Sequence, residues 1–495
     1  MALRRANIKP PLEVVVDNLI YFERRMHVKT YIHINKKNGE ILSRNRRGFY
    51  CKEKEKLIKE YGFKESDFLC VENEVEKYHL KDFMKKSFGL KDEMYNFWLW
   101  NSAYNENNIN GFSLPCKVET NAEYRAELEK ILMQYIECLN KPPFIYSGIL
   151  NDIEQECSWL IKALDYLIEG ENEKAENLIE RVVDLLDIDS FFVSELDKSY
   201  SFRAIAPFAT LQNVEYNKVY KKMMEENLTF FRVRTKQSSS LNNITNVEQM
   251  LHLPYNLREK AVSSRFSSAE TPSLYLGTSS YICSKECKWN GIDEMYVSVF
   301  VPNSRGKKFK ILNLTISQAL INGIYNRNLK DDNNQIRYKL QNDMLKIYSL
   351  VIATSFSVEK QEETKFEYLL SQTLMKVVSK RGIDGIAYLS MKGENEFQYP
   401  QGVNLVIPAT DISSDKPYSE KCDGFNVSEP VLYLKQKCNK KKSYVNEIFG
   451  PHDDIIGSVT PKMVIDGEQK PYSTTEFGEF DNYLVSHFLP IIKKA

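Results

Sequence analysis

Three arginines, a tyrosine and a glutamate lie close together in the middle of this 495-residue chain. Arg232 and Arg234 alternate within an aromatic run, Arg265 follows in an Arg-Phe-Ser unit, and Tyr275 and Glu286 come ten and then eleven residues further along. An arginine guanidinium donates two parallel hydrogen bonds to a phosphate and stays charged. A carboxylate beside a sugar stabilises the oxocarbenium-like centre that forms when a glycosidic bond breaks. These residue types therefore fit a pocket for a phosphate-rich nucleoside whose glycosidic bond is cleaved.

Two polar residues of later β-like runs can complete such a pocket. Ser390 ends the run GIDGIAYLS, and Asn404 lies in GVNLV. Serine and asparagine can orient a phosphate or an attacking group through neutral hydrogen bonds, and the ring of Tyr275 can stack on a leaving base. Glu286 could stabilise the ribosyl centre or hold ribose hydroxyls. Each residue alone also has a structural interpretation, since strand arginines commonly face solvent, so the prediction rests on the joint pattern.

The elements that would position these residues read as strands with helical insertions. The β-like runs are LTFFRVR, PSLYL, EMYVSVFVP, FKILNLT, GIDGIAYLS and GVNLVIPA, and long helices are expected around 336–356 and 362–381. Such spacing predicts a mixed α/β or α+β domain rather than a regular βαβ repeat. No GxGxxG or Walker A sequence occurs, so neither Rossmann nor P-loop nucleotide binding is indicated.

Three amphipathic helices precede this region. They are NAEYRAELEKILMQYIECLN, GILNDIEQECSWLIKALDYLIEG and NEKAENLIERVVDLL. Asn121 is the expected N-cap of the first helix, and Gly170 closes the second. Short connections predict an antiparallel bundle. A ribonuclease or nucleic-acid-binding module is one interpretation of this half, because helical domains of this sort include HEPN ribonucleases. Those enzymes carry an Arg that is followed four to six residues later by a His, and no such pair occurs here. A scaffold or oligomerisation element is therefore favoured.

Composition narrows the class of protein. The 67 basic residues balance the 67 acidic ones, which argues against a whole-chain polyanion binder, so no nucleic-acid partner is expected. No run of 18 apolar residues occurs, so we expect no membrane partner. The nine scattered cysteines form no paired CxxC motifs, so neither a disulfide framework nor a metal site is predicted. A cytoplasmic protein with reduced thiols fits best.

With these motifs in view, the chain resembles RES domain proteins, which are named for arginine, glutamate and serine. The resemblance covers about 205–410. It rests on FFRVR, HLP (252–254), RFSSAETPSLYLGT, Glu286, Y-x3-Q (368–372), GIDGIAYLS and GVNLV. The helical half also resembles the HEPN-like region that precedes RES domains in longer proteins.

The resemblance implies an α+β chain in which an N-terminal helical region precedes a RES-like mixed α/β domain related to the ADP-ribosyltransferase fold. It implies an enzyme that consumes NAD as substrate, without a cofactor, by phosphorolysis or hydrolysis of the nicotinamide–ribose bond. Inorganic phosphate would be the co-substrate of phosphorolysis, and transfer of ADP-ribose to a protein is the alternative. Many members are toxins held by an antitoxin, so an inhibitory partner is expected; homo-oligomerisation is left open.

The family's functional positions fall on seven residues here, and its first arginine falls on Arg232, with Arg234 as the second choice. The expected catalytic residues are Glu286, Arg232 and Ser390, and the expected NAD-binding residues are Arg234, Arg265, Tyr275 and Asn404. In the implied mechanism Arg232 and Arg265 bind the pyrophosphate, Tyr275 packs against nicotinamide and Glu286 stabilises the ribosyl cation. Where the family often has Gly before a proline, Glu270 and Thr271 precede Pro272 here.

Four parts are expected along the chain. They are an α+β segment over 1–115, a helical accessory region over 116–204, the RES-like catalytic domain over 205–410, and a C-terminal extension over 411–495 that packs on the catalytic domain.

Overall fold

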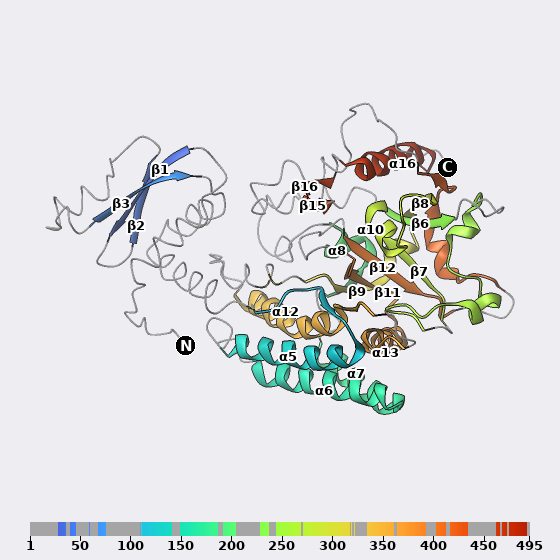
Figure 1. The fold of residues 1–495 in the computed structure, drawn as a ribbon, viewed down its shortest axis with the longest axis horizontal. Helices are drawn as coiled ribbons and strands as arrows, with labels where there is room; N and C mark the ends of the chain where they lie inside the picture. The colour runs from blue at the N-terminus through green and yellow to red at the C-terminus, as the bar shows by residue number, and fades with distance from the viewer. Residues whose placement is uncertain are drawn as a thin grey trace. The chain divides into compact units, whose positions relative to one another are not determined.

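The structure is a computed structural model, shown in Figure 1. It describes residues 28–35, 40–45, 59, 68–75, 109, 111–140, 149–186, 192–203, 228–236, 244–268, 271–316, 318, 321, 334–360, 364–392, 402–411, 416–433, 462–465, 468–472 and 475–492. The chain divides into two compact units, one of residues 1–110, 138–146 and 318–332 and one of residues 111–137, 147–317 and 333–495. Glu270 of the sequence motif lies outside the described residues.

The first unit contains a three-stranded antiparallel sheet. Its strands β1 (Val28–Asn35), β2 (Glu40–Asn45) and β3 (Phe68–Val75) have the order β2-β1-β3. Strand β1 pairs with β3 along its whole length and with β2 from Tyr31 to Asn35, as the alternating run VKTYIHI favours.

A mixed nine-stranded sheet forms the centre of the second unit. Its strands are β5 (Val193–Glu195), β6 (Phe230–Lys236), β7 (Ser273–Gly277), β8 (Glu294–Pro302), β9 (Lys310–Leu314), β11 (Gly385–Leu389), β12 (Val403–Pro408), β13 (Phe425–Val427) and β14 (Val431–Leu432). Their order is β13-β8-β6-β7-β12-β11-β9-β5, with β14 also paired to β8. Only β11 and β9 pair in parallel among these described strands. The predicted α+β class is therefore confirmed.

Two smaller strand pairs lie outside the large sheet. Strands β4 (Cys116–Val118) and β10 (Phe356–Val358) pair in parallel, and β15 (Lys462–Ile465) and β16 (Glu468–Pro471) pair antiparallel.

The helices follow the predicted periodicity. They are α5 (Asn121–Leu139), α6 (Leu150–Ile168), α7 (Asn172–Leu185), α8 (Tyr200–Arg203), α10 (Ser280–Glu286), α12 (Asn334–Thr354), α13 (Phe366–Lys380) and α16 (Glu476–Ile492). Short 3-10 turns lie at Leu196–Lys198, Val247–Met250, Tyr255–Lys260, Gly306–Lys308 and Glu420–Gly424. The chain leaves α6 through Gly170, whose φ of +82° is readily adopted only by glycine. None of the described helices is long and apolar enough to cross a membrane.

The predicted N-cap of α5 is wrong by one residue. The hydroxyl of Thr120 accepts a hydrogen bond from the backbone N–H of Glu123 at 3.3 Å, which is the N-cap arrangement. The Asn121 side chain instead reaches α13, donating to the carbonyl of Thr364 at 2.7 Å and accepting from the N–H of Phe366 at 3.3 Å. Asn121 therefore joins two helices rather than capping its own.

Helix α13 packs against the helices that precede the sheet in sequence, and Figure 1 shows α5, α6, α7, α12 and α13 gathered together. Glu176 of α7 forms ion pairs with Lys376 and Lys380 of α13. Arg381, which follows α13, pairs with Asp184 at 2.7 Å. The same helix α13 also contacts the predicted site, as described below.

The side chains of strand β6 alternate between the two faces of the sheet, and a separate core cluster covers each face. Phe230 packs in one core cluster and meets Phe202 edge-on at a ring distance of 4.9 Å. Phe231 and Val233 point the other way, into a second cluster formed with α10, β8 and α16. The alternation places Arg232 and Arg234 on the face that Phe230 occupies, where Arg232 meets strand β7 and Arg234 meets the loop at Leu251.

Candidate active site

Glu286 lies at the last turn of α10 and is exposed, yet its carboxylate is held by two buried donors. The hydroxyl of Ser390 and the side-chain amide of Asn404 each donate to its Oε1 atom at 2.7 Å. Ser390 follows β11 and Asn404 lies on β12, and the pairing of these strands brings both side chains to one point. No described residue donates to Oε2, so this oxygen is available to a ligand.

Helix α10 approaches the sheet closely because Gly277 has no side chain. A Cβ atom at this position would come within 2.5 Å of the Cys283 sulfur and 2.9 Å of Ile282 Cγ2. Gly277 lies opposite Asn404 in the register of β7 and β12. The glycine therefore sets the separation between the helix that carries Glu286 and the strand that carries its donor.

The start of α10 is fixed by its own cap and by the C-terminal helix α16. The hydroxyl of Ser279 accepts from the N–H of Ile282 at 3.2 Å. Asp481 of α16 is buried and accepts from the N–H of Ser280 at 3.0 Å and from the hydroxyl of Tyr472 at 2.5 Å. Burial raises the pKa of Asp481 to about 7.

Arg232 and Arg234 lie two residues apart on β6, and each donates a hydrogen bond to a backbone carbonyl. Arg232 donates to the carbonyl of Tyr275 at 3.1 Å, and Arg234 donates to that of Leu251 at 3.0 Å. Burial, together with the charge of Arg234, lowers the pKa of Arg232 to about 9. The buried Nε atom of Arg234 has no hydrogen-bond partner in the described part of the chain. Both arginines line the same cavity, so the pair concentrates positive charge on its wall.

Arg265 is buried and holds the end of a helix. Its guanidinium donates to the carbonyls of Thr354 at 2.9 Å and Phe356 at 2.6 Å, where α12 ends and β10 begins. Its charge also lies over the ring of Tyr368 at 5.1 Å. A cation at a helix C-terminus is favourable because the last carbonyls have no intrahelical partner. Arg265 therefore has a structural role as well as a place in the cavity.

The turn that carries Arg265 is held from two sides. The side-chain amide of Gln372 on α13 donates to the carbonyls of Ser264 at 2.8 Å and Ser267 at 3.2 Å. The Tyr275 hydroxyl accepts from the N–H of Phe266 at 3.1 Å and lies 3.1 Å from the Ser267 hydroxyl. Burial raises the pKa of Tyr275 to about 12. Tyr275 and Gln372 together fix the position of Arg265.

These residues surround a cavity of about 790 Å³. Six of the seven predicted residues line it, namely Arg232, Arg234, Arg265, Tyr275, Glu286 and Asn404. Ser390, the seventh, reaches the site through Glu286. The lining contains eight basic side chains and only three acidic ones, so the cavity favours an anionic ligand.

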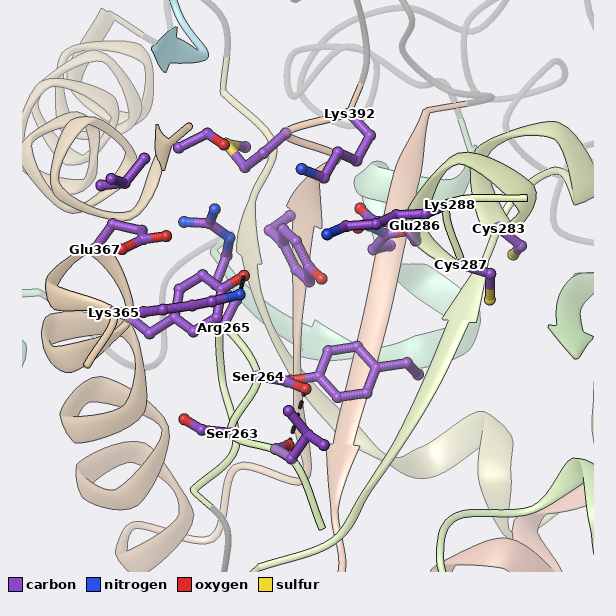
Figure 2. A pocket seen from close by; sticks show the side chains of 18 of the residues that line it. Ser263, Ser264, Arg265, Cys283, Glu286, Cys287, Lys288, Lys365, Glu367 and Lys392 are labelled. Carbon is purple, nitrogen blue, oxygen red and sulfur yellow. Dashed lines mark hydrogen bonds between the residues drawn. The ribbon is translucent and has the colours of Figure 1, made fainter. Parts of the chain in front are cut away.

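Several lining residues were not predicted from the sequence. Figure 2 shows Lys288 and Lys392 on the side of Glu286, and Lys365 and Glu367 on the side of Arg265. Lys288 is two residues from Glu286 in the sequence, and this adjacency was the only available signal. Lys392 is likewise two residues from Ser390, whereas nothing in the sequence places Lys365 or Glu367 beside the other site residues.

His252 of the HLP motif has a structural role. It is buried, its Nε2 accepts from the N–H of Ser419 at 3.0 Å, and its Nδ1 lies 2.7 Å from the Leu253 carbonyl. The accepting Nε2 requires the proton on Nδ1, which then donates to Leu253. Burial lowers the pKa of His252, so the neutral ring is favoured.

Comparisons with known proteins give two similarities. No protein-family model matches the chain. A Bacillus subtilis (strain 168) protein named "Putative toxin YopC" is 23% identical over 399 residues, which is 77% of this chain and 79% of that protein. One chain in the crystal structure of the M. tuberculosis MbcT-MbcA toxin-antitoxin complex aligns with 42% of this chain and 85% of its own length, at 13% identity and a TM-score of 0.21.

Proposed function

We propose that this protein is an enzyme that consumes NAD by cleaving the bond between nicotinamide and ribose. The observation that carries the proposal is the Glu286 carboxylate, held through Oε1 by Ser390 and Asn404 at 2.7 Å each on the wall of a strongly basic cavity. The arrangement fixes Oε1, while no residue in the described part of the chain donates to Oε2.

The chemistry follows from the bond that breaks. The electron pair of the C1′–N bond leaves with nicotinamide, which departs as a neutral base, and positive charge develops on the ribosyl carbon and ring oxygen. A fixed carboxylate stabilises that charge without having to reorganise. Water or phosphate then attacks C1′ and loses a proton, which gives ADP-ribose or its phosphate ester.

The basic side chains fit the remainder of the substrate. NAD carries two negative charges on its pyrophosphate, and arginine binds such groups through paired donors. Arg232 and Arg234 each use one donor nitrogen on a backbone carbonyl and retain others for the ligand. The cavity of about 790 Å³ lies within the range for nucleotide-sized ligands.

Two residues would both support the structure and bind the substrate. Arg265 contacts the pyrophosphate with the donors that Thr354 and Phe356 leave unused. Tyr275 presents its ring to the nicotinamide while its hydroxyl holds the Arg265 turn.

A toxin role is part of the proposal. It is supported by the name of the B. subtilis relative and by the resemblance of the motif set to RES domain proteins. We further propose that a partner protein restrains the activity, as an antitoxin does.

The test is incubation of the purified chain with NAD, with and without inorganic phosphate, followed by mass analysis of the products. Free ADP-ribose in both conditions identifies a hydrolase, and phosphorylated ADP-ribose identifies a phosphorylase. Nicotinamide release that requires added protein, with label retained on that protein, identifies an ADP-ribosyltransferase. Intact NAD in all three conditions contradicts the proposal.

A further inference from the structure

Lys288 has an unusual backbone conformation. Its φ of 53° lies in the left-handed region, and no other non-glycine residue in the described part of the chain has a positive φ. It follows the C-cap of α10, where its N–H donates to the Lys285 carbonyl at 3.1 Å and the N–H of Trp289 donates to that of Ser284 at 3.0 Å. These two bonds define a helix ending in which glycine is strongly preferred at the position of Lys288. A lysine there is unfavourable for the backbone.

The side chain of Lys288 lies in the cavity. Figure 2 shows it extending past Glu286 into the space that Arg265 and Lys365 face from the other side. No ion pair of Lys288 is found in the described part of the chain, although Glu286 is two residues away. The ammonium is therefore available to a ligand in the cavity.

The charges around Lys288 are mainly of the same sign. Burial lowers the pKa of Lys392; the Glu286 carboxylate opposes this change, and repulsion from Lys288, Arg265 and Lys365 adds to it. Lys288 and Lys392 thus form, on the side of Glu286, a second group of positive charge distinct from the arginines of β6. Such a group is stabilised when an anion binds between its members.

We propose that Lys288 binds a phosphate oxygen of the substrate, and that the left-handed backbone is retained because it aims the ammonium at this oxygen. Backbone strain in a non-glycine residue is commonly found at functional sites. Lysine acts as a compact point charge toward phosphate. The inference rests on the proposed function, because it names a residue that recognises the anionic group at the same site. The phosphate belongs either to the dinucleotide or to a free phosphate that attacks the ribose.

Replacement of Lys288 by glycine should change stability and substrate binding in opposite directions. Lys288→Gly removes the strain and the ammonium together, so Tm should rise while KM for the bound phosphate species increases by about tenfold or more, as expected for loss of a charge-assisted hydrogen bond. Lys288→Asn, which also tolerates the left-handed region, should raise the same KM. Lys288→Arg keeps the charge and should restore most of the binding.

The control is Lys285→Gln. Lys285 lies in α10, three residues before Lys288. Its ammonium lies over the Tyr281 ring at 5.2 Å, and the residue does not line the cavity. The Lys285→Gln variant also removes one positive charge near the end of α10, and it should leave the KM for NAD and the KM for phosphate unchanged. A higher KM for NAD identifies the dinucleotide phosphate as the ligand of Lys288, and a higher KM for phosphate alone identifies the free anion.

The outcome is distinguishable from a failure of the proposed function. If the wild-type protein consumes NAD and Lys288→Gly gains stability with both KM values unchanged, Lys288 is a surface residue and the inference is overturned. If the wild-type protein leaves NAD intact, calorimetric titration with ADP-ribose and with inorganic phosphate replaces the kinetic assay. Loss of binding of either probe in Lys288→Gly and Lys288→Asn, but not in Lys285→Gln, supports the inference; unchanged or undetectable binding of both probes overturns it.

Discussion

Asp481 of the C-terminal helix α16 accepts a hydrogen bond from the backbone N–H of Ser280, at 3.0 Å, at the opposite end of α10 from Glu286. The same carboxylate oxygen accepts from the Tyr472 hydroxyl at 2.5 Å, and the other oxygen is buried without a partner. The position of the candidate catalytic carboxylate thus depends on a segment nearly 200 residues away in sequence.

Replacement of Asp481 by asparagine should remove a pH dependence of stability. Burial raises the pKa of Asp481 from 3.8 to about 7, so the folded state binds a proton that the unfolded state has lost. As the pH rises from about 4 to about 7, the free energy of unfolding of the wild type should therefore fall relative to that of Asp481→Asn. The fall should reach up to about 1.4 kcal/mol per pH unit. Urea unfolding across this range measures the difference. Parallel curves for the two proteins would contradict it.

Replacement of Glu286 by glutamine should greatly reduce turnover and leave the fold intact. Glutamine retains an oxygen that accepts from Ser390 and Asn404 but carries no charge for the ribosyl centre. We expect kcat on NAD to fall by about 10² to 10³-fold. Because Glu286 is exposed, Tm should be unchanged. Glu429→Gln, which removes an exposed carboxylate outside the cavity, is the control. Equal activity of the two variants would remove Glu286 from the mechanism.

Replacement of Asn404 by aspartate should move the pH profile. The side-chain amide of Asn404 lies 2.7 Å from Glu286 Oε1, so an aspartate there places two carboxylates together. Repulsion disfavours ionisation of both carboxylates at once, so the acidic limb of the kcat/KM profile should move to higher pH by about one unit or more. Asn404→Ala should lower kcat without that displacement. An unchanged limb in Asn404→Asp would show that ionised Glu286 is not required.

Replacement of Arg265 by alanine should destabilise the protein as well as inactivate it. The change leaves the carbonyls of Thr354 and Phe356 without their donor. We expect the free energy of unfolding to fall by about 3 kcal/mol. Arg258→Ala, which removes an arginine stacked on Tyr255 at 4.4 Å, should cost much less. Chemical denaturation of both variants compares them, and equal losses would refute the role of Arg265 at the end of α12.

Replacement of Gly277 by alanine should displace α10 from the sheet. The new Cβ would lie 2.5 Å from the Cys283 sulfur, so the free energy of unfolding should fall by about 1–3 kcal/mol and turnover should fall with it. Cys283→Ala in the same chain removes the closest contact and should recover part of both losses, which a double-mutant cycle measures. Additive losses would show that the contact does not set the position of α10.

The local elements could be predicted from the sequence because their periodicity is strong. The run EMYVSVFVP coincides with β8, and the alternating FFRVR with most of β6. The cap of α5 was wrong because the Asn121 side chain is used in a tertiary contact with α13, which no local pattern reveals. The boundaries proposed at 115, 204 and 410 stay predictions.

The site was only partly accessible from the sequence. The types and spacing of Arg265, Tyr275 and Glu286 pointed to one pocket, which Ser390 was expected to complete, and the resemblance to RES domain proteins gave these residues their expected roles. The convergence of Ser390 and Asn404 on one oxygen depends on strand pairing across more than 100 residues. The support from Asp481 depends on the packing of α16, and no sequence motif indicated the role of this residue.

The strand β5 has a practical consequence for anyone who wishes to shorten the chain. It pairs with β9 at the edge of the nine-stranded sheet, and β4 pairs with β10 beside the carbonyl that holds Arg265. A fragment that begins at residue 205 lacks both strands and exposes the backbone of β9 and β10. Unpaired strand edges recruit other chains and promote aggregation. A fragment meant to keep the cavity intact must therefore include the chain from Cys116 onward.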